Sequence, residues 1–354
     1  MSATTLHTAA KQLVKLSAGL TDSGLNNLSR ILACTHVFVA LETINTKMNM
    51  DPYPVLFKAL NNANSMLSLS ESISHEIDES RNISNHTEVG VNHTIDLFEN
   101  AWTTYSSATY DHSVELVKTR LNNSGFNEAW FAGKKCFDGG CGTGRLAIAM
   151  AQMGAKEVTA VDLGNDSLDY LRKVINRYNL TNIKVVNHDI TELSSWASNE
   201  FDFVASNGVL HHTEACDRGI IEHYRITKPD GIFWVYLYGA GGLYWQMYDA
   251  LKGIVINISP KEIRKTLHGL GFREGMIYTY LDNFLAPRVY YSRDSFLKLL
   301  VDQGEYSWRH AKGSSEIDDT EILLNTSYGK QIYGPQGEVR LILTKKSITT
   351  QTKS

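Results

Sequence analysis

Three glycines at alternate positions form a turn that suits a nucleotide-like ligand. Residues 137–144 read Phe-Asp-Gly-Gly-Cys-Gly-Thr-Gly, between a run that predicts a strand (135–138) and a run that predicts a helix (145–150). Glycine lets the backbone turn sharply and approach a ligand with no side chain between. The following helix directs its free N–H groups and the positive end of its dipole at the turn. The octet therefore predicts a site for a nucleotide-like molecule with negative charge near the turn.

The acid at the end of the first strand, Asp138, helps to decide which nucleotide this is. Gly142, Gly144 and Ala147 satisfy the loose form of the dinucleotide fingerprint G-x-G-x-x-G/A, so a nicotinamide dinucleotide stays an alternative. The carboxylate of Asp138 would repel a pyrophosphate, whereas it would attract an ammonium group. Asp138 therefore favours a cofactor that carries an amino group.

Polar residues end three further runs that predict buried parallel strands. The runs are 157–162, 183–189 and 201–207, and they end in Asp162, Asp189 and Asn207. An acid at the carboxyl end of such a strand can accept both hydroxyls of a ribose. For Asp162 the competing interpretation is a helix N-cap, and for Asp189 it is the capping of the next turn.

The order of these landmarks closely resembles that of class I S-adenosylmethionine-dependent methyltransferases. The D-x-G-x-G-x-G pattern at 138–144 is similar to the first motif of that family, and Val-Leu-His-His at 209–212 resembles a signature of its quinone-biosynthesis branch. Lys-Pro-Asp-Gly at 228–231 resembles the family's Lys-Pro-Gly-Gly turn, with Asp230 in place of the first glycine, a mild departure because aspartate tolerates turn geometry. The resemblance covers about residues 105–240, with a weaker echo near the C-terminus.

The resemblance implies S-adenosylmethionine as the cofactor and assigns roles to its binding residues. Asp138 would face the amino group, Asp162 would accept the ribose hydroxyls and Asp189 the adenine amine. An aromatic residue, Tyr110, would cap the methionine end, unless its ring only packs a helix on the sheet. The implied cofactor-binding residues are Tyr110, Asp138, Gly139, Gly140, Cys141, Gly142, Thr143, Gly144, Asp162, Leu163, Asp189, Ile190, Asn207 and Gly208.

Methyl transfer from a sulfonium needs donor and acceptor in near-attack geometry, and a base only for some acceptors. His211 and His212 follow the fourth predicted strand, beside the expected place of the methyl group, so either is a candidate general base. The alternative is that the histidines only shape the pocket. Tyr238, at the end of the fifth predicted strand (232–238), is a candidate residue of the acceptor pocket. The four cysteines show no metal-ligand spacing, so no metal is expected.

The predicted fold is α/β: a doubly wound, mostly parallel, seven-stranded Rossmann-like sheet whose seventh strand (338–343) is antiparallel. We expect a mainly helical N-terminal extension over 1–100, a methyltransferase domain over 101–346 with an insertion at about 240–290, and a polar tail over 347–354. In the insertion, Ser259 and Pro260 predict a helix start. The extension and the insertion would wall the acceptor pocket.

Composition limits the partners. The net charge of −4 gives no overall electrostatic signature of nucleic-acid binding. No apolar stretch is long enough to predict a membrane span, and scattered cysteines without a signal sequence predict a cytoplasmic protein. The expected acceptor is an O, N or C nucleophile of a small molecule or a glycan- or lipid-type metabolite. The alternatives are a protein or RNA methyltransferase that docks through its N-terminal region, an NAD-dependent oxidoreductase, and a catalytically silent cofactor-binding scaffold; the oligomeric state stays open.

Overall fold

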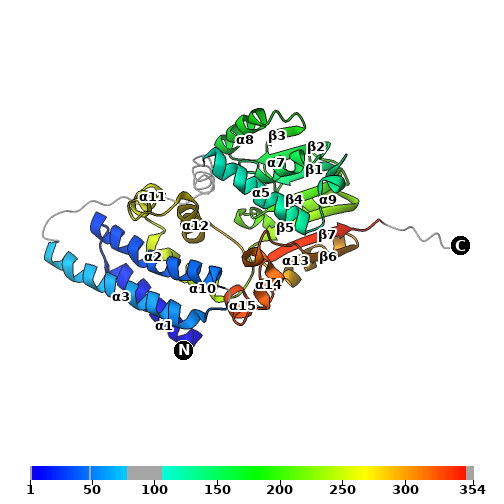
Figure 1. The fold of residues 1–354 in the computed structure, drawn as a ribbon. Coiled ribbons are helices and arrows are strands. Elements are labelled where there is room, and N and C mark those ends of the chain that lie inside the picture. The colour runs from blue at the N-terminus through cyan, green and yellow to red at the C-terminus, as the bar shows by residue number, and fades with distance from the viewer. Residues whose placement is uncertain (1, 48, 78–105, 348–354) are drawn as a thin grey trace. The chain divides into compact units, whose positions relative to one another are not determined.

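The computed structural model describes residues 2–47, 49–77 and 106–347 of the 354-residue chain (Figure 1). The chain divides into two units. Unit 1 contains the N-terminal helices together with Gly241–Ala286 and Asn325–Pro335. Unit 2 contains the described residues 106–240, 287–324 and 336–347. Each unit is therefore built from segments that are distant in sequence.

Unit 2 is organised around one seven-stranded sheet with the order β3-β2-β1-β4-β5-β7-β6. The pairs formed by the first five strands are parallel, and β7 pairs antiparallel with both β5 and β6. This sheet confirms the predicted fold class and the antiparallel seventh strand. The strands are β1 (Lys135–Gly139), β2 (Glu157–Asp162), β3 (Ile183–Asn187), β4 (Phe201–Asn207), β5 (Thr227–Leu237), β6 (Tyr306–His310) and β7 (Val339–Lys345).

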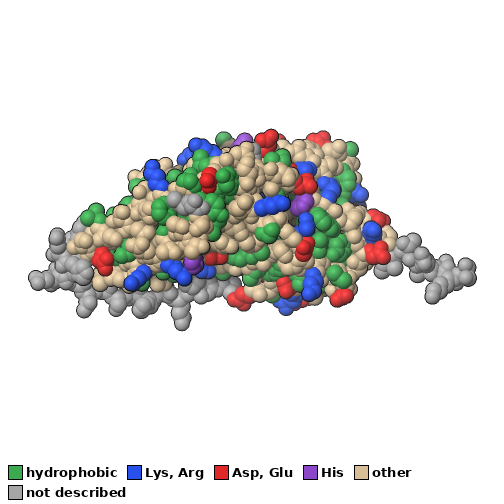
Figure 2. Space-filling view, turned by 90° about the horizontal axis from the view of Figure 1, so that it is seen from below, with side chains coloured by type: hydrophobic (Ala, Val, Ile, Leu, Met, Phe, Trp, Pro, Cys, Tyr) green, Lys and Arg blue, Asp and Glu red, His purple; other side chains and the backbone are tan. Residues whose placement is uncertain are grey.

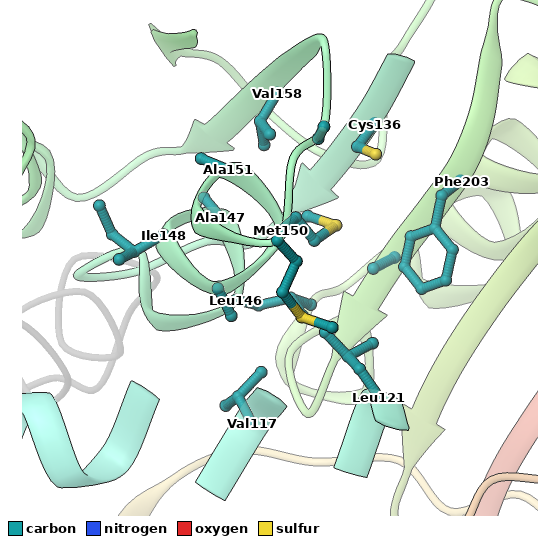
Figure 3. Close-up of a cluster of buried hydrophobic side chains, with 14 of the residues drawn as sticks. Val117, Leu121, Cys136, Leu146, Ala147, Ile148, Met150, Ala151, Val158 and Phe203 are labelled. Atoms are coloured by element: carbon teal, nitrogen blue, oxygen red, sulfur yellow. The ribbon is translucent and has the colours of Figure 1, made fainter. Parts of the chain in front are cut away.

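Two hydrophobic cores lie on the two faces of this sheet. Successive strand residues point to opposite faces, and the neighbours Cys136 and Phe137 of β1 belong to different cores. The first core, shown in Figure 3, packs α5 (Ser107–Asn123), α7 (Arg145–Gln152) and α8 (Asn165–Arg177) on the sheet. The second packs α9 (Cys216–Ile226), α13 (Arg293–Leu299) and the 3-10 turn η1 (Leu210–His212) on the other face. The shorter elements of unit 2 are α6 (Glu128–Phe131), η2 (Val301–Gln303), η3 (Glu316–Asp318) and α14 (Thr320–Leu324).

Unit 1 is helical. Its elements are α1 (Ala3–Gly19), α2 (Gly24–Thr46), α3 (Pro52–Ile77), α10 (Leu243–Val255), α11 (Pro260–Gly269), α12 (Glu274–Leu285) and α15 (Gly329–Tyr333). Helix α10 packs on α1, α2, α12 and α15, so the inserted helices share a core with the N-terminal ones. The start of α11 is confirmed: Ser259 is its N-cap and Pro260 its first residue.

Several strand bounds differ from the prediction, and the differences in the third and fifth strands are the ones that affect the site. The third strand ends at Asn187, so Asp189 lies in the loop beyond it. The fifth begins at Thr227, because the expected turn at 228–231 is a register irregularity within β5 and not a break before it. Asp230, with φ 59°, supplies the left-handed conformation that this irregularity needs. None of the described helices is both long and apolar enough to cross a membrane.

Candidate active site

The direction of the chain reverses in the sheet between β1 and β4, and the glycine turn follows β1 directly. From β1 the chain builds outward through β2 and β3, then returns to the other side of β1 with β4. In open α/β sheets, the crevice at such a switch point, outside the carboxyl ends of the strands, is where ligands bind. The turn is tied to β2, since the N–H groups of Gly140 and Cys141 donate to the carbonyl of Val161 at 2.8 and 3.0 Å.

Glycine is required at Gly144 and leaves open space at Gly142. Gly144 has φ 83°, and a Cβ atom built on it would lie 2.2 Å from the side chain of Leu171. Gly142 has φ 51°, and nothing lies within 4 Å of the corresponding position. The backbone of the turn is thus packed against α8 on one side and accessible at its tip, which is where a ligand would approach.

Asp162 holds the tip of the turn. Its Oδ2 accepts a hydrogen bond from the N–H of Gly142 at 2.7 Å, and its Oδ1 accepts one from Gly164 at 2.9 Å. Burial raises the pKa of Asp162, while these backbone hydrogen bonds act in the opposite direction. A carboxylate has about four acceptor positions, so two backbone bonds leave capacity for the hydroxyls of a ribose.

The carboxyl group of Asp138 is buried without full hydrogen bonding. The residue is 2% exposed, and its Oδ2 has no hydrogen-bond partner among the described residues. Burial raises the pKa of Asp138 to about 7; the charge of Asp162 adds to this rise, and the N–H of Ala147 and the charge of Arg145 oppose it. An unsatisfied buried carboxyl oxygen costs free energy, which an ammonium group of a ligand would offset. The carboxyl group of Asp138 therefore fits the amino group of S-adenosylmethionine.

Tyr110 contacts the same turn from α5. Its hydroxyl donates to the carbonyl of Thr143 at 2.8 Å, and its ring is 1% exposed beside Tyr170, with 5.5 Å between the ring centroids. In this structure Tyr110 therefore stabilises the turn through this hydrogen bond. Its role as a cap on the methionine end stays a prediction.

Five further predicted cofactor residues lie in different settings. Oδ1 of Asp189 accepts from the N–H and the hydroxyl of Thr191, both at 2.8 Å, so this carboxylate caps its own turn. The side chain of Asn207 accepts from the indole of Trp234 at 3.4 Å. Leu163 is 41% exposed beside Asp162, whereas Ile190 is buried in the core around α9. Gly208, at the end of β4, donates its N–H to the carbonyl of Tyr236 at 3.0 Å.

Two residues of the turn face protein. A Cβ atom on Gly139 would lie 2.0 Å from Nε2 of His223, so this glycine makes room for a buried side chain of α9. Cys141 packs against the core formed with α5 and α7, and burial raises the pKa of its thiol. The thiol is therefore protonated and fills space in this core.

The two histidines and Tyr238 lie together next to β4. The ring of His211 is fully buried, 3.8 Å from the ring of Tyr238 and 4.1 Å from that of His212, between centroids. Neither ring nitrogen of His211 has a hydrogen-bond partner among the described residues. Burial lowers its pKa well below the usual value, and the charges of His212 and Arg288 lower it further. His211 is therefore a neutral imidazole with an available proton acceptor.

A segment that the sequence did not assign to the site crosses this cluster. The N–H of Val289 donates to the carbonyl of His211 at 2.9 Å, and Nδ1 of His212 donates to the carbonyl of Pro287 at 2.7 Å. The N–H of Tyr291 donates to the carbonyl of Tyr238 at 3.0 Å. We call Pro287–Tyr291 the strap. It was predicted to belong in part to the insertion, and no local pattern marks it as part of the site.

Basic and aromatic groups continue the site toward β7. The guanidinium of Arg340 lies 3.9 Å from the ring centroid of Tyr236 and is paired with Glu338 at 3.1 Å. Tyr236 in turn lies 6.2 Å from His211 between ring centroids. Within the described part of the chain, no group of three or more His, Cys, Asp or Glu residues is placed to hold a metal ion.

Comparison with known proteins points to the same class. Residues 137–235 match a family model described as a methyltransferase domain. A ubiquinone biosynthesis O-methyltransferase of Acinetobacter baylyi is 28% identical over 130 residues, which cover 37% of this chain and 53% of that relative. A ribosomal protein L11 methyltransferase of a Thermoanaerobacter species is 43% identical over 54 residues, 15% of this chain and 18% of that one.

A solved structure of an S-adenosyl-L-methionine-dependent methyltransferase from Methanococcus maripaludis, described as putative, is 18% identical, with a TM-score of 0.40 over 75% of this chain and 98% of that chain. The part of this chain that matches the ubiquinone relative covers only about half of that relative's length, and the part that matches the L11 relative covers far less of its length. With the strand order and the glycine turn, the family match identifies a class I S-adenosylmethionine-dependent methyltransferase domain in this chain, and S-adenosylmethionine is the cofactor of that family.

Proposed function

We propose that the chain is a methyltransferase that moves a methyl group from S-adenosylmethionine to a nucleophile of a small molecule. The observation that carries the proposal is the buried, incompletely bonded carboxyl group of Asp138 beneath the glycine turn. A cofactor with an ammonium group satisfies this oxygen, whereas the pyrophosphate of a dinucleotide would add negative charge beside it. This disfavours the oxidoreductase alternative, although the glycine spacing permits it.

S-adenosylmethionine supplies a methyl group activated by a sulfonium. The chain's own residues bind and orient it: Asp138 would accept from the amino group, and Asp162 would accept from the ribose hydroxyls while it holds Gly142. Because methyl transfer is an in-line displacement, this positioning supplies much of the acceleration.

We further propose that His211, rather than His212, takes the proton when the acceptor is a hydroxyl. His211 is neutral, buried and without a hydrogen-bond partner among the described residues, so a ring nitrogen is available to accept. His212 already donates from Nδ1 to Pro287 and so holds the strap. The bond chemistry follows directly: the acceptor oxygen forms the new O–C bond, its proton moves to His211, and the C–S bond breaks with its electron pair left on sulfur.

A small-molecule acceptor is supported by the similarity to ubiquinone biosynthesis O-methyltransferases. The similarity to a ribosomal protein methyltransferase covers a shorter region and keeps a protein acceptor as the second candidate. On the face shown in Figure 2, the side chains of Lys and Arg are interspersed with those of Asp and Glu, which does not favour an RNA acceptor.

Calorimetry with two ligands tests the cofactor. We expect S-adenosylhomocysteine to bind with a dissociation constant of about 1 μM or tighter, which corresponds to roughly −8 kcal/mol, and NADH to bind at least 100-fold more weakly. Binding of NADH alone would refute the proposal. A third outcome is that S-adenosylhomocysteine binds but is not formed when the protein is incubated with S-adenosylmethionine and extracts of small metabolites. This outcome would favour the catalytically silent scaffold or a protein acceptor.

The comparison of His211→Gln with His212→Gln tests the base. If His211 accepts the proton, its variant should lose about 100-fold in turnover while cofactor affinity is kept. Because its pKa lies well below 6.5, turnover of the wild type should be level from pH 6.5 to 9, with any acid limb below that range. Equal turnover in the wild type and in both variants would show that catalysis here is positioning alone.

A further inference from the structure

We infer that Asp111 and Arg177 are positioning residues for the cofactor, because they join the first turn of α5 to the end of α8. They act through Tyr110, the neighbour of Asp111, whose hydroxyl bonds to the glycine turn. We call the contacts of Asp111 with Arg177 and Tyr178 the latch. The inference rests on the proposed function, since its consequence is tighter binding of S-adenosylmethionine.

The glycine turn needs support from outside at Thr143. This residue stands between Gly142 and Gly144, and glycine restricts the backbone less than any other residue. Thr143 is 2% exposed, so its carbonyl needs a partner within the protein. The next N–H, that of Gly144, donates to the carbonyl of Cys141 at 2.8 Å. The peptide group after Thr143 is thus held by the turn itself at its N–H, whereas its carbonyl depends on another element.

Tyr110 is the partner of this carbonyl, and it is the buried residue at the start of α5. Residues 107–109 are exposed, whereas Tyr110 is 1% exposed. Burial raises the pKa of Tyr110, so its hydroxyl stays protonated and donates to Thr143 at 2.8 Å. The start of α5 therefore meets the turn through one side chain, and whatever fixes this side chain also fixes the turn.

Asp111 ties the same part of α5 to α8. Its Oδ1 accepts from the guanidinium of Arg177 and from the hydroxyl of Tyr178. This hydroxyl in turn accepts from Arg177 at 3.0 Å. The guanidinium also lies 5.6 Å from the ring centroid of Tyr110, within the range of a cation–π contact. One cation therefore contacts the ring and the carboxylate of two consecutive residues of α5.

The latch closes a ring of three elements. The side chain of Leu171 in α8 lies 2.2 Å from the place of a Cβ atom on Gly144, Tyr110 of α5 bonds to the turn, and the latch joins α5 to α8. The side chains of Arg177 and Asp111 are 33% and 48% exposed, and an ion pair exposed in this way adds little to global stability. Its effect is therefore expected on the position of Tyr110 and on cofactor affinity.

The test is a set of affinities for S-adenosylhomocysteine, measured by calorimetry. Tyr110→Phe removes the hydrogen bond and keeps the ring, so affinity should fall about fivefold. Asp111→Ala and Arg177→Gln should each lower affinity about threefold, and Arg177→Lys should retain part of it. In the Tyr110→Phe background, Asp111→Ala should have no further effect, because the latch acts through the tyrosine.

Arg172→Gln is the matched control. Arg172 also lies on α8, but it pairs with Asp169 of the same helix at 2.7 Å, so the loss of its charge should leave affinity unchanged. Hydrogen exchange of the ligand-free protein supplies a second measurement. Amides of 143–146 should exchange at least about threefold faster in Tyr110→Phe and in Arg177→Gln, and at the wild-type rate in Arg172→Gln.

Three results would overturn the inference: an unchanged affinity in Tyr110→Phe, equal affinities in Arg177→Gln and Arg172→Gln, or losses that add in the double variant. A purely structural role would lower the unfolding temperature of the variants and leave their affinities unchanged. If Tyr110→Phe does not fold, the comparison of Arg177→Gln with Arg172→Gln decides the matter.

The failure of this inference is distinct from the failure of the proposed function. If S-adenosylhomocysteine binds the wild type and the variants alike, the proposed methyl transfer stands and only the latch is refuted. If it does not bind the wild type, the proposed function is refuted, and the exchange of 143–146 without ligand still decides whether the latch holds the turn.

Discussion

The carboxyl group of Asp138 makes both stability and cofactor affinity depend on pH. Its pKa is about 7 in the folded chain and about 3.8 when the group is solvated. A raised folded pKa contributes stability that is fully present below pH 3.8 and is lost as the pH rises through 7. Relative to Asp138→Asn, the free energy of unfolding of the wild type should fall by roughly 3 kcal/mol from pH 5 to pH 8. Urea unfolding at four pH values measures this difference.

Cofactor binding should show the opposite trend. An ammonium group prefers the ionised carboxylate, so affinity for S-adenosylhomocysteine should increase from pH 6 to pH 8 in the wild type and stay level in Asp138→Asn. Parallel pH profiles of affinity in the two proteins would mean that Asp138 does not meet the amino group.

At Asp162, binding and local structure are linked. Asp162→Ala removes a charge-assisted contact to the ribose, worth about 2–3 kcal/mol, so affinity should fall by about 30–150-fold. It also removes the acceptor for the N–H groups of Gly142 and Gly164, so a moderate loss of stability of about 1–2 kcal/mol is expected without ligand. The sequence alone did not reveal this second role.

The control for Asp162 is Asp169→Ala on α8, where the carboxylate is 65% exposed and pairs with Arg172. Exposed ion pairs contribute little, so neither stability nor affinity should change measurably. Calorimetry and thermal unfolding supply both quantities. An unchanged affinity in Asp162→Ala would assign this residue to the structure of the turn alone.

At the scale of elements, β1 and α9 fit together through Gly139 and His223. A methyl group on Gly139 would lie 2.0 Å from Nε2 of a fully buried imidazole. Gly139→Ala should therefore destabilise the protein by about 1–3 kcal/mol through overpacking. His223→Ala opens space, so the double variant should be more stable than the sum of the single changes predicts.

Gly253→Ala is the control for this packing. Gly253 lies within α10, and nothing is within 4 Å of the added methyl group. Alanine is the better helix former, so stability should rise by about 0.5–1 kcal/mol. Chemical unfolding of the wild type, the two single variants and the double variant gives the coupling energy, and Gly253→Ala is measured beside them. Strict additivity of Gly139→Ala and His223→Ala would contradict the proposed steric contact.

The elements that the sequence predicted well are those with strong local signals. Strands β2 and β4 have the predicted bounds because each is an apolar run buried on both faces and ends in a polar residue. The N-cap of α11 was recognised because Ser259 and Pro260 are a local pattern. The start of β5 was missed because the residues around Asp230 have the pattern of a turn, whereas in the structure they form an irregularity within the strand. This irregularity depends on the pairing of β5 with β4, which the sequence does not show.

The strap could not be predicted for a different reason. Its hydrogen bond to His212 joins residues 75 positions apart, and its sequence has no pattern that distinguishes it from a loop. In the same way, Tyr110 was predicted to cap the methionine end of the cofactor or to pack its helix on the sheet, but the bond from its hydroxyl to Thr143 depends on how α5 packs. These long-range contacts of the strap and of Tyr110 are therefore the part of this site that requires a structure.

At the scale of the whole chain, each unit is assembled from distant segments. Unit 1 combines the N-terminal helices with α10–α12 and with α15, whose residue Tyr333 donates to Asn45 at 2.6 Å. A buried network within it joins Glu42 of α2 to the hydroxyls of Tyr244 and Tyr248, at 2.8 and 3.3 Å. These polar contacts specify how the inserted helices meet α2, because each buried group needs its partner. The predicted domain limits at residues 100 and 346 stay a prediction.

Hydrogen exchange tests where in the chain the cofactor acts. The proposed contacts lie on the turn after β1 and the loop after β2, and ligand binding stabilises the folded state by about 2.7 kcal/mol at 100 times the dissociation constant. With S-adenosylhomocysteine, amides of 139–145 and 162–165 should therefore exchange at least tenfold more slowly. Peptides of α2 serve as the internal reference and should not change. An unchanged exchange rate at 139–145 under saturating ligand would contradict the proposed site, whereas protection there that disappears in Asp162→Ala would tie it to the carboxylate that holds the turn.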